Sequence, residues 1–125
     1  MLIGVTVLTS MSEEELQGEV GISRPLTEQV AAMAKLAKES GLDGVVASAK
    51  EIKIIREACG DDFVIVTPGI RPRDAAADDQ KRIKTPGEAV QDGADYLVIG
   101  RPITKAADRT AAVNAIVADM EAALS

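Results

Sequence analysis

Two arginines carry the clearest chemical signal in this sequence. Arg71 and Arg101 each follow a short, β-branched apolar run, Gln80 lies nine residues after Arg71, and Gly100 immediately precedes Arg101. The guanidinium group is a planar fork of donors that matches phosphate, and glycine lets a backbone N–H approach an anion closely. Either arginine alone would more often be a surface or ion-pairing residue. Together, these residues predict a site for one small phosphate dianion.

The composition narrows the choice of partners. The chain has 125 residues, a net charge of −6, one Phe, one Tyr and no Trp. An acidic surface repels a nucleic-acid backbone, and so few aromatic side chains offer little for bases to stack on. The absence of histidine removes the usual general base and the usual transition-metal ligand. No apolar run approaches the roughly 20 residues of a membrane span. We therefore expect a small phosphate ligand, no nucleic acid and no membrane.

The single cysteine indicates the compartment. Cys59 has no second cysteine with which to form an intrachain disulfide, so a cytoplasmic location is expected. Its place at the apolar end of an expected helix favours a packing role over a reactive one. The N-terminus has neither the basic region nor the cleavage site typical of a signal peptide.

Four apolar runs alternate with helical patterns and must position these residues. We expect buried strands at residues 2–8, 44–47, 63–66 and 96–99. Helices are expected to begin at Ser12, after Pro25, at Ser48, at Thr85 and near Asp108. The last helix is expected to bury one side, made of Val113, Ile116, Val117, Met120 and Leu124.

This order of elements predicts an α/β fold with a parallel sheet covered by helices. Four βα units are half of a (β/α)8 TIM barrel, in which phosphate is often held by the loops after the last two strands. Arg71 follows the third expected strand and Arg101 the fourth. The polar stretch 71–84 fits neither helix nor strand and is longer than most βα connections, as expected for a closing lid.

Five segments resemble one enzyme family in order and spacing. They are Val5–Met11, Gly41–Val46, Val66–Pro72, Asp79–Arg82 and Tyr96–Thr104. Together they resemble bacterial-type orotidine 5′-phosphate decarboxylase, and the resemblance covers essentially the whole chain. It implies a carboxy-lyase of pyrimidine synthesis that converts orotidine monophosphate to uridine monophosphate and CO2 without a cofactor or metal.

The resemblance also implies a role for individual residues. Arg71 and Arg101 would hold the 5′-phosphate beside the Gly100 backbone, and Gln80 would bridge phosphate and base from a mobile loop. Three further residues would line the pyrimidine, namely Thr9, Ser10 and Pro68. Without the resemblance, Thr9 and Ser10 could equally cap the next helix, and Pro68 could simply mark a turn.

One departure from the family pattern is large. The family's chemistry depends on an alternating Lys/Asp array that includes an Asp-x-Lys-x-x-Asp motif, which this sequence lacks. The nearest match begins at Asp79 but ends in Lys84. Residues 1–125 are therefore expected to be the C-terminal half-barrel, with no catalytic residue of their own and no activity when isolated.

Two alternatives stay open. The chain could be a self-associating, non-catalytic half-barrel, because an open half-barrel exposes two strand edges and favours a homo-oligomer such as a dimer. It could also be another phosphate-binding barrel decarboxylase, for example one that acts on a sugar phosphate. If the chain is the C-terminal half of the enzyme, its partner is a missing N-terminal half; if it is a self-associating half-barrel, its partner is another copy of the chain.

Overall fold

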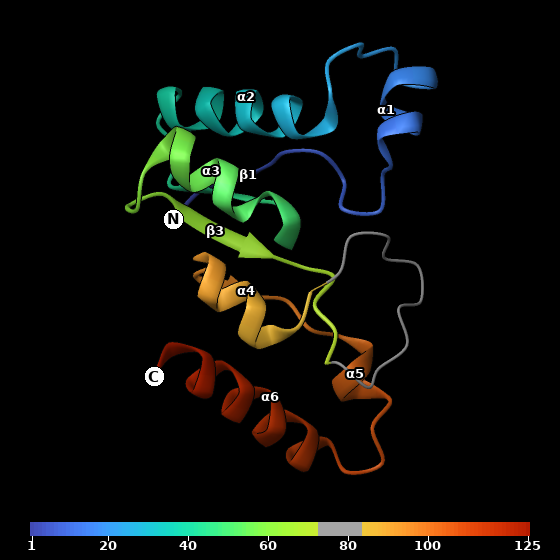
Figure 1. The fold of residues 1–125 in the computed structure, drawn as a ribbon, viewed down its shortest axis with the longest axis vertical. Coiled ribbons are helices and arrows are strands. Elements are labelled where there is room, and N and C mark those ends of the chain that lie inside the picture. The colour runs from blue at the N-terminus through green and yellow to red at the C-terminus, as the bar shows by residue number, and fades with distance from the viewer. Residues whose placement is uncertain (73–83) are drawn as a thin grey trace.

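The computed structural model describes residues 1–72 and 84–125. Four parallel strands form one sheet in the order β1-β2-β3-β4. The strands are β1 (Ile3–Val5), β2 (Gly44–Val46), β3 (Val64–Thr67) and β4 (Tyr96–Leu97). The helices are α1 (Glu13–Gly18), α2 (Leu26–Glu39), the 3-10 turn η1 (Ala49–Glu51), α3 (Ile52–Cys59), α4 (Pro86–Asp92), α5 (Arg101–Thr104) and α6 (Arg109–Leu124). Figure 1 shows α2, α3, α4 and α6 one below another, in the order in which they occur along the chain. The predicted alternation of strands and helices is confirmed, although each strand is shorter or shifted by a residue.

The helix starts follow the capping signals in the sequence. Ser12 and Thr85 each accept a hydrogen bond from the backbone N–H three residues on, and the glutamate at that position accepts one from the backbone N–H of the cap residue. Asp108 caps α6 by accepting from Ala111 N. Gly93 ends α4 with a φ of 112°, a left-handed conformation that residues with a side chain rarely adopt. Of the helices in the described ranges, none is long and apolar enough to cross a membrane.

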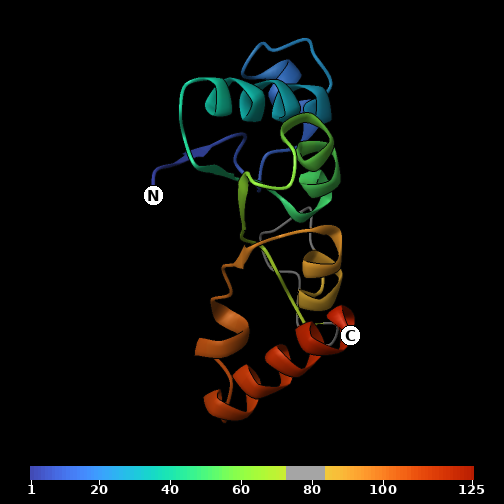
Figure 2. The same ribbon diagram turned by 90° about the vertical axis from the view of Figure 1, so that its left-hand side faces the viewer.

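The sheet has one covered face and one open face. Val45 and Ile65 point to the covered face and are 1% and 0% exposed. On the other face, Val5 and Tyr96 belong to the same cross-strand row and are 59% and 56% exposed. Figure 2 shows α3 and α4 on one side of β3. The prediction of fully buried strands is therefore wrong for one face, because nothing in the described chain covers it.

The predicted inward side of α6 is also largely wrong. Ile116 alone of that set is fully buried, while Val113, Val117 and Leu124 are 39%, 44% and 68% exposed. The helix packs mainly on α4, and it follows β4, the last strand of the sheet. Within the described residues, no further βα unit packs on its far side. By contrast, the packing role expected for Cys59 is confirmed, because this residue at the end of α3 lies in the core.

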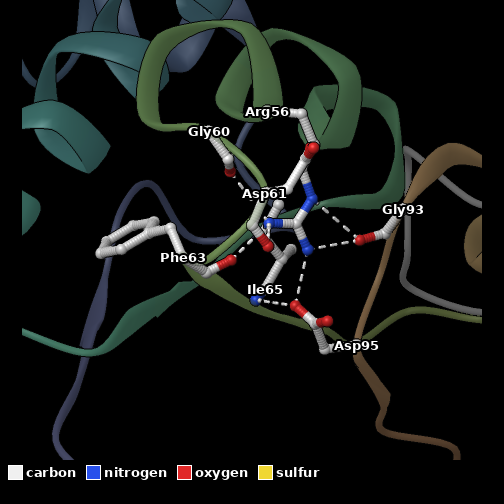
Figure 3. A network of polar contacts seen from close by, with 7 residues as sticks. All are labelled: Arg56, Gly60, Asp61, Phe63, Ile65, Gly93 and Asp95. Atoms are coloured by element: carbon white, nitrogen blue, oxygen red, sulfur yellow. Dashed lines mark hydrogen bonds and ion pairs between the residues drawn. The ribbon is translucent and has the colours of Figure 1, made fainter.

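A single arginine ties the amino-terminal edge of the sheet together (Figure 3). Arg56 on α3 donates to the carbonyl oxygens of Gly60, Asp61, Phe63 and Gly93. These carbonyls follow α3, precede β3 and end α4, so one side chain holds three elements at the edge opposite the predicted site.

Candidate functional site

The predicted residues in the described ranges follow the carboxyl ends of three of the four strands, at one edge of the sheet. Thr9 and Ser10 follow β1, Pro68 and Arg71 follow β3, and Arg101 follows β4. Because the strands are parallel, all these loops leave the sheet at the same edge. Neighbouring strands β3 and β4 place the two arginine loops side by side. Gln80 lies outside the described residues.

Arg71 is the most enclosed of these side chains. The residue is only 6% exposed, and its backbone N–H donates to Lys84 O at 3.1 Å. Within the described ranges, the buried Nε atom has no hydrogen-bond partner. A buried donor of a charged group without a partner is costly, so such groups normally meet an acceptor. An anion bound at this edge would supply that acceptor.

Arg101 lies at the start of a helical turn that was not predicted. α5 begins at this residue, directly after Gly100, whose carbonyl accepts from the backbone of Ile103 at 2.9 Å and of Thr104 at 3.0 Å. Arg101 is half-buried and Gly100 is exposed. A Cβ atom placed on Gly100 would meet nothing within 4 Å, so the space beside this backbone is open.

The residues predicted to line a base are less enclosed. Ser10 is exposed, whereas Thr9 and Pro68 are half-buried. The cap of the following helix is Ser12, so neither Thr9 nor Ser10 is its N-cap. The helix-cap alternative for these two residues is therefore wrong, and the base-lining role remains a prediction.

Further buried polar residues line the same edge and were not singled out from the sequence. Thr67, at the end of β3, is 0% exposed, and its Oγ1 has no hydrogen-bond partner in the described chain. Ser48 and Glu51, just after β2, are also buried. Thr6, just after β1, donates from Oγ1 to Val46 O at 2.9 Å. A usable signal was present: a polar residue directly after an apolar strand lies at the carboxyl end of that strand.

Asp92 on α4 is the acid linked to this region through Lys84. Its Oδ1 lies 3.2 Å from Lys53 Nζ, and its Oδ2 forms an ion pair with Lys84 Nζ. Burial by itself would raise the pKa of Asp92, but hydrogen bonds from Lys84 and Lys53 outweigh it and lower that pKa. Asp92 is therefore a carboxylate at neutral pH.

Residues 1–116 match the family described as "Orotidine 5'-phosphate decarboxylase / HUMPS family". The chain belongs to this family. The match runs from β1 through the first half of α6, so the strand-end loops described above all lie within it.

Relatives and solved structures in the family agree with this assignment. Orotidine 5'-phosphate decarboxylase from Geotalea daltonii is 61% identical over 97% of this chain and 50% of its own length, and that from Moorella thermoacetica is 60% identical over 97% and 48%. A crystal structure of orotidine 5'-phosphate decarboxylase from Lactobacillus acidophilus, 44% identical, superposes with a TM-score of 0.79 over 95% of this chain and 48% of that one. The chain thus spans about half the length of the curated relatives it matches. Its fold is half of the family's TIM barrel.

Proposed function

We propose that residues 1–125 form the C-terminal, phosphate- and base-binding half of an orotidine 5′-phosphate decarboxylase. The complete enzyme would convert orotidine monophosphate to uridine monophosphate and CO2 in the cytoplasm, without a cofactor or metal. One observation carries the proposal: Arg71 and Arg101 follow neighbouring parallel strands at one edge, and the buried Arg71 Nε has no partner in the described chain. Family membership supports the choice of substrate.

Each residue has a specific part in this proposal. Arg71 and Arg101 bind the 5′-phosphate, since two guanidinium forks can satisfy a dianion with charge-assisted hydrogen bonds. The open space beside Gly100 lets its backbone approach the phosphate. Gln80 bridges phosphate and base.

Three small or half-enclosed residues complete the pocket in the proposal. Thr9, Ser10 and Pro68 line the pyrimidine, and their loops leave the same edge of the sheet as the arginines. The exposed Ser10 hydroxyl is available to a base edge.

The isolated half should bind but not react. Decarboxylation in this family requires the Lys/Asp array to hold charge near the substrate carboxylate and to protonate the resulting carbanion. The sequence lacks the Asp-x-Lys-x-x-Asp motif. We therefore place the catalytic groups on the N-terminal half of the enzyme, which would also cover the open face of the sheet.

The test combines binding, turnover and complementation. The isolated chain should bind uridine monophosphate, and Arg71→Lys and Arg101→Lys should each weaken binding by about tenfold or more, because lysine cannot form the bidentate contact. Turnover of orotidine monophosphate should appear only on co-expression with the first half of the Geotalea daltonii relative. Turnover by the isolated chain at a rate near that of the whole enzyme would show that the chemistry does not need a second half.

A second candidate is a self-associating, non-catalytic half-barrel, in which a homodimer closes the barrel. The open face favours it, because Val5 and Tyr96 are more than half exposed and the edges of β1 and β4 have no strand partner in the described chain. Analytical ultracentrifugation at micromolar concentration distinguishes the two: a dimer supports self-association, and a folded monomer counts strongly against it.

A third candidate is another phosphate-binding barrel decarboxylase of the same superfamily, acting on a sugar phosphate. Equal affinity for ribose 5-phosphate and uridine monophosphate would favour it, because a sugar-phosphate site gains nothing from a pyrimidine. Tighter binding of uridine monophosphate favours the nucleotide enzyme.

A further inference from the structure

Asp92 forms the centre of a three-residue ion-pair cluster on the helical side of the sheet. Its side chain is only 10% exposed, as is expected of a carboxylate held between two ammonium groups. Lys53 belongs to α3 and is 73% exposed, whereas Lys84 is 29% exposed and reaches Asp92 from eight residues earlier in the chain. The pair of Asp92 and Lys84 is therefore more enclosed than the pair of Asp92 and Lys53.

Lys84 connects this cluster to the predicted phosphate site through its backbone. Its carbonyl accepts from the N–H of Arg71 at 3.1 Å, and Ile70 forms an isolated parallel bridge with the same residue. The side chain of Lys84 is thus held by Asp92 while its main chain holds Arg71. Because the backbone at Arg71 sets the direction of its side chain, a shift of Lys84 moves the guanidinium group.

We infer that Asp92 is a positioning residue for phosphate binding: it anchors Lys84, and Lys84 fixes the backbone of Arg71. The inference rests on the proposed function, since the phosphate role of Arg71 is itself a proposal. Asp92 does not touch the ligand in this scheme, and its effect passes through two contacts in series: its ion pair with Lys84, and the hydrogen bond between the backbones of Lys84 and Arg71.

A second ion pair in the same fold provides a matched control. Arg56 and Asp95 are joined at 2.6 Å, but they lie at the amino-terminal edge of the sheet, away from the predicted site. Loss of Asp95 should lower stability without a specific effect on Arg71. Loss of Asp92 should lower stability and also disturb the position of Arg71.

The first measurement reports on position without any ligand. Amide hydrogen exchange and the chemical shift of the Arg71 N–H are followed by NMR in the whole chain and in Lys84→Met and Asp92→Asn. We expect exchange at Arg71 to rise by about tenfold beyond the change in global stability in both variants. Lys53→Met and Asp95→Asn should change it no more than they change global exchange.

The second measurement is affinity for uridine monophosphate, corrected for the folded fraction. Lys84→Met and Asp92→Asn should each weaken binding by about tenfold, a size usual for coupled residues in one network. Lys53→Met and Asp95→Asn should stay within about twofold of the original chain, since neither substitution breaks the link between Lys84 and Arg71.

The two possible failures are distinguishable. If Arg71→Lys abolishes binding while Asp92→Asn changes neither affinity nor Arg71 exchange, the phosphate site stands and the positioning role of Asp92 is wrong. If Arg71→Lys binds uridine monophosphate as well as the original chain does, the phosphate role of Arg71 is wrong, and the inference falls with it.

Discussion

Asp95 Oδ2 accepts two hydrogen bonds at once, from Arg56 Nη2 at 2.6 Å and from Ile65 N at 2.9 Å. The acid thereby joins the start of β4 to α3 and to the middle of β3 (Figure 3). In a (β/α)8 barrel the edge at the amino ends of the strands serves stability and the opposite edge serves chemistry. The Arg56–Asp95 pair lies at the first of these edges, and the hydrogen bond between the backbones of Lys84 and Arg71 lies at the other.

We predict that Arg56→Met lowers the free energy of unfolding by about 3 kcal/mol, because several carbonyl oxygens lose a charged donor. Methionine keeps the aliphatic stem, so the loss is mainly polar. Urea denaturation measures the change. Arg109→Met serves as the control, since Arg109 is exposed and donates to the single carbonyl of Thr104. Equal effects in the two variants would contradict the structural role of Arg56.

The Gly44 position should tolerate no side chain. Gly44 pairs with Val64, and an added Cβ would lie 2.2 Å from Val64 O. Gly44→Ala should therefore lower stability by about 3 kcal/mol or prevent folding, because backbone atoms of β3 would have to move. Gly18→Ala is the matched control, as its Cβ would meet nothing within 4 Å. Thermal melts of both variants make the comparison, and similar midpoints would show that the strands can separate at low cost.

Much of the fold could be predicted from local signals. The capping boxes at Ser12 and Thr85, the stop at Gly93 and the periodic apolar residues of α2 depend on neighbours within a few residues. The burial of strand residues, by contrast, does not depend only on neighbours in the sequence. Val45 and Val46 are adjacent β-branched residues, and only the helices packed on one face decide that Val45 is buried more completely.

The candidate site likewise has features that could be predicted from the sequence and features that could not. Arg71 and Arg101 could be found because each follows an apolar strand, and the parallel sheet then brings their loops together. The burial of Thr67 and the link from Asp92 through Lys84 to Arg71 could not be found, because they depend on the packing of side chains from separate elements.

Acid should weaken the fold through Asp92. Its folded-state pKa lies below the ordinary value of 3.8, so the stability that it contributes is present above that value and is lost as pH falls through the folded-state pKa. The difference in unfolding free energy between the original chain and Asp92→Asn should be about 2 kcal/mol at pH 7, as for a hydrogen-bonded charged pair. This difference in unfolding free energy should become smaller below about pH 4.

Urea denaturation at a series of pH values tests this sign. Asp62→Asn removes a carboxylate from an exposed turn and serves as the control. A difference between the original chain and Asp92→Asn that grows toward low pH would contradict a lowered pKa for Asp92.

Ligand binding should depend on pH through the ligand rather than the protein. The chain has no histidine, the side chain whose ordinary pKa falls in the pH range of this measurement. The second pKa of a phosphate monoester is about 6, so affinity for uridine monophosphate should rise between about pH 5 and pH 7 as the dianion forms. Calorimetric titration measures it, and uridine, which lacks the phosphate, should bind too weakly to detect. Comparable binding of uridine would show that the base, rather than the phosphate, supplies most of the affinity.

Two valines on opposite faces of the sheet test whether the open face is covered in solution. Val45 is 1% exposed and Val5 is 59% exposed, although both are strand residues of the same type. For an isolated monomer, Val45→Thr should cost about 2 kcal/mol, because a hydroxyl is buried among apolar side chains, whereas Val5→Thr should cost less than about 0.5 kcal/mol.

The dependence on protein concentration completes this test. If a second copy closes the barrel, Val5 becomes buried at the contact, and Val5→Thr should then destabilise by an amount that grows with concentration. Unfolding curves at two concentrations about a hundredfold apart make the comparison; at saturation such a shift corresponds to about 2.7 kcal/mol. A small cost of Val5→Thr at both concentrations means that the face stays open, and that it is free to receive the N-terminal half that the proposed enzyme requires.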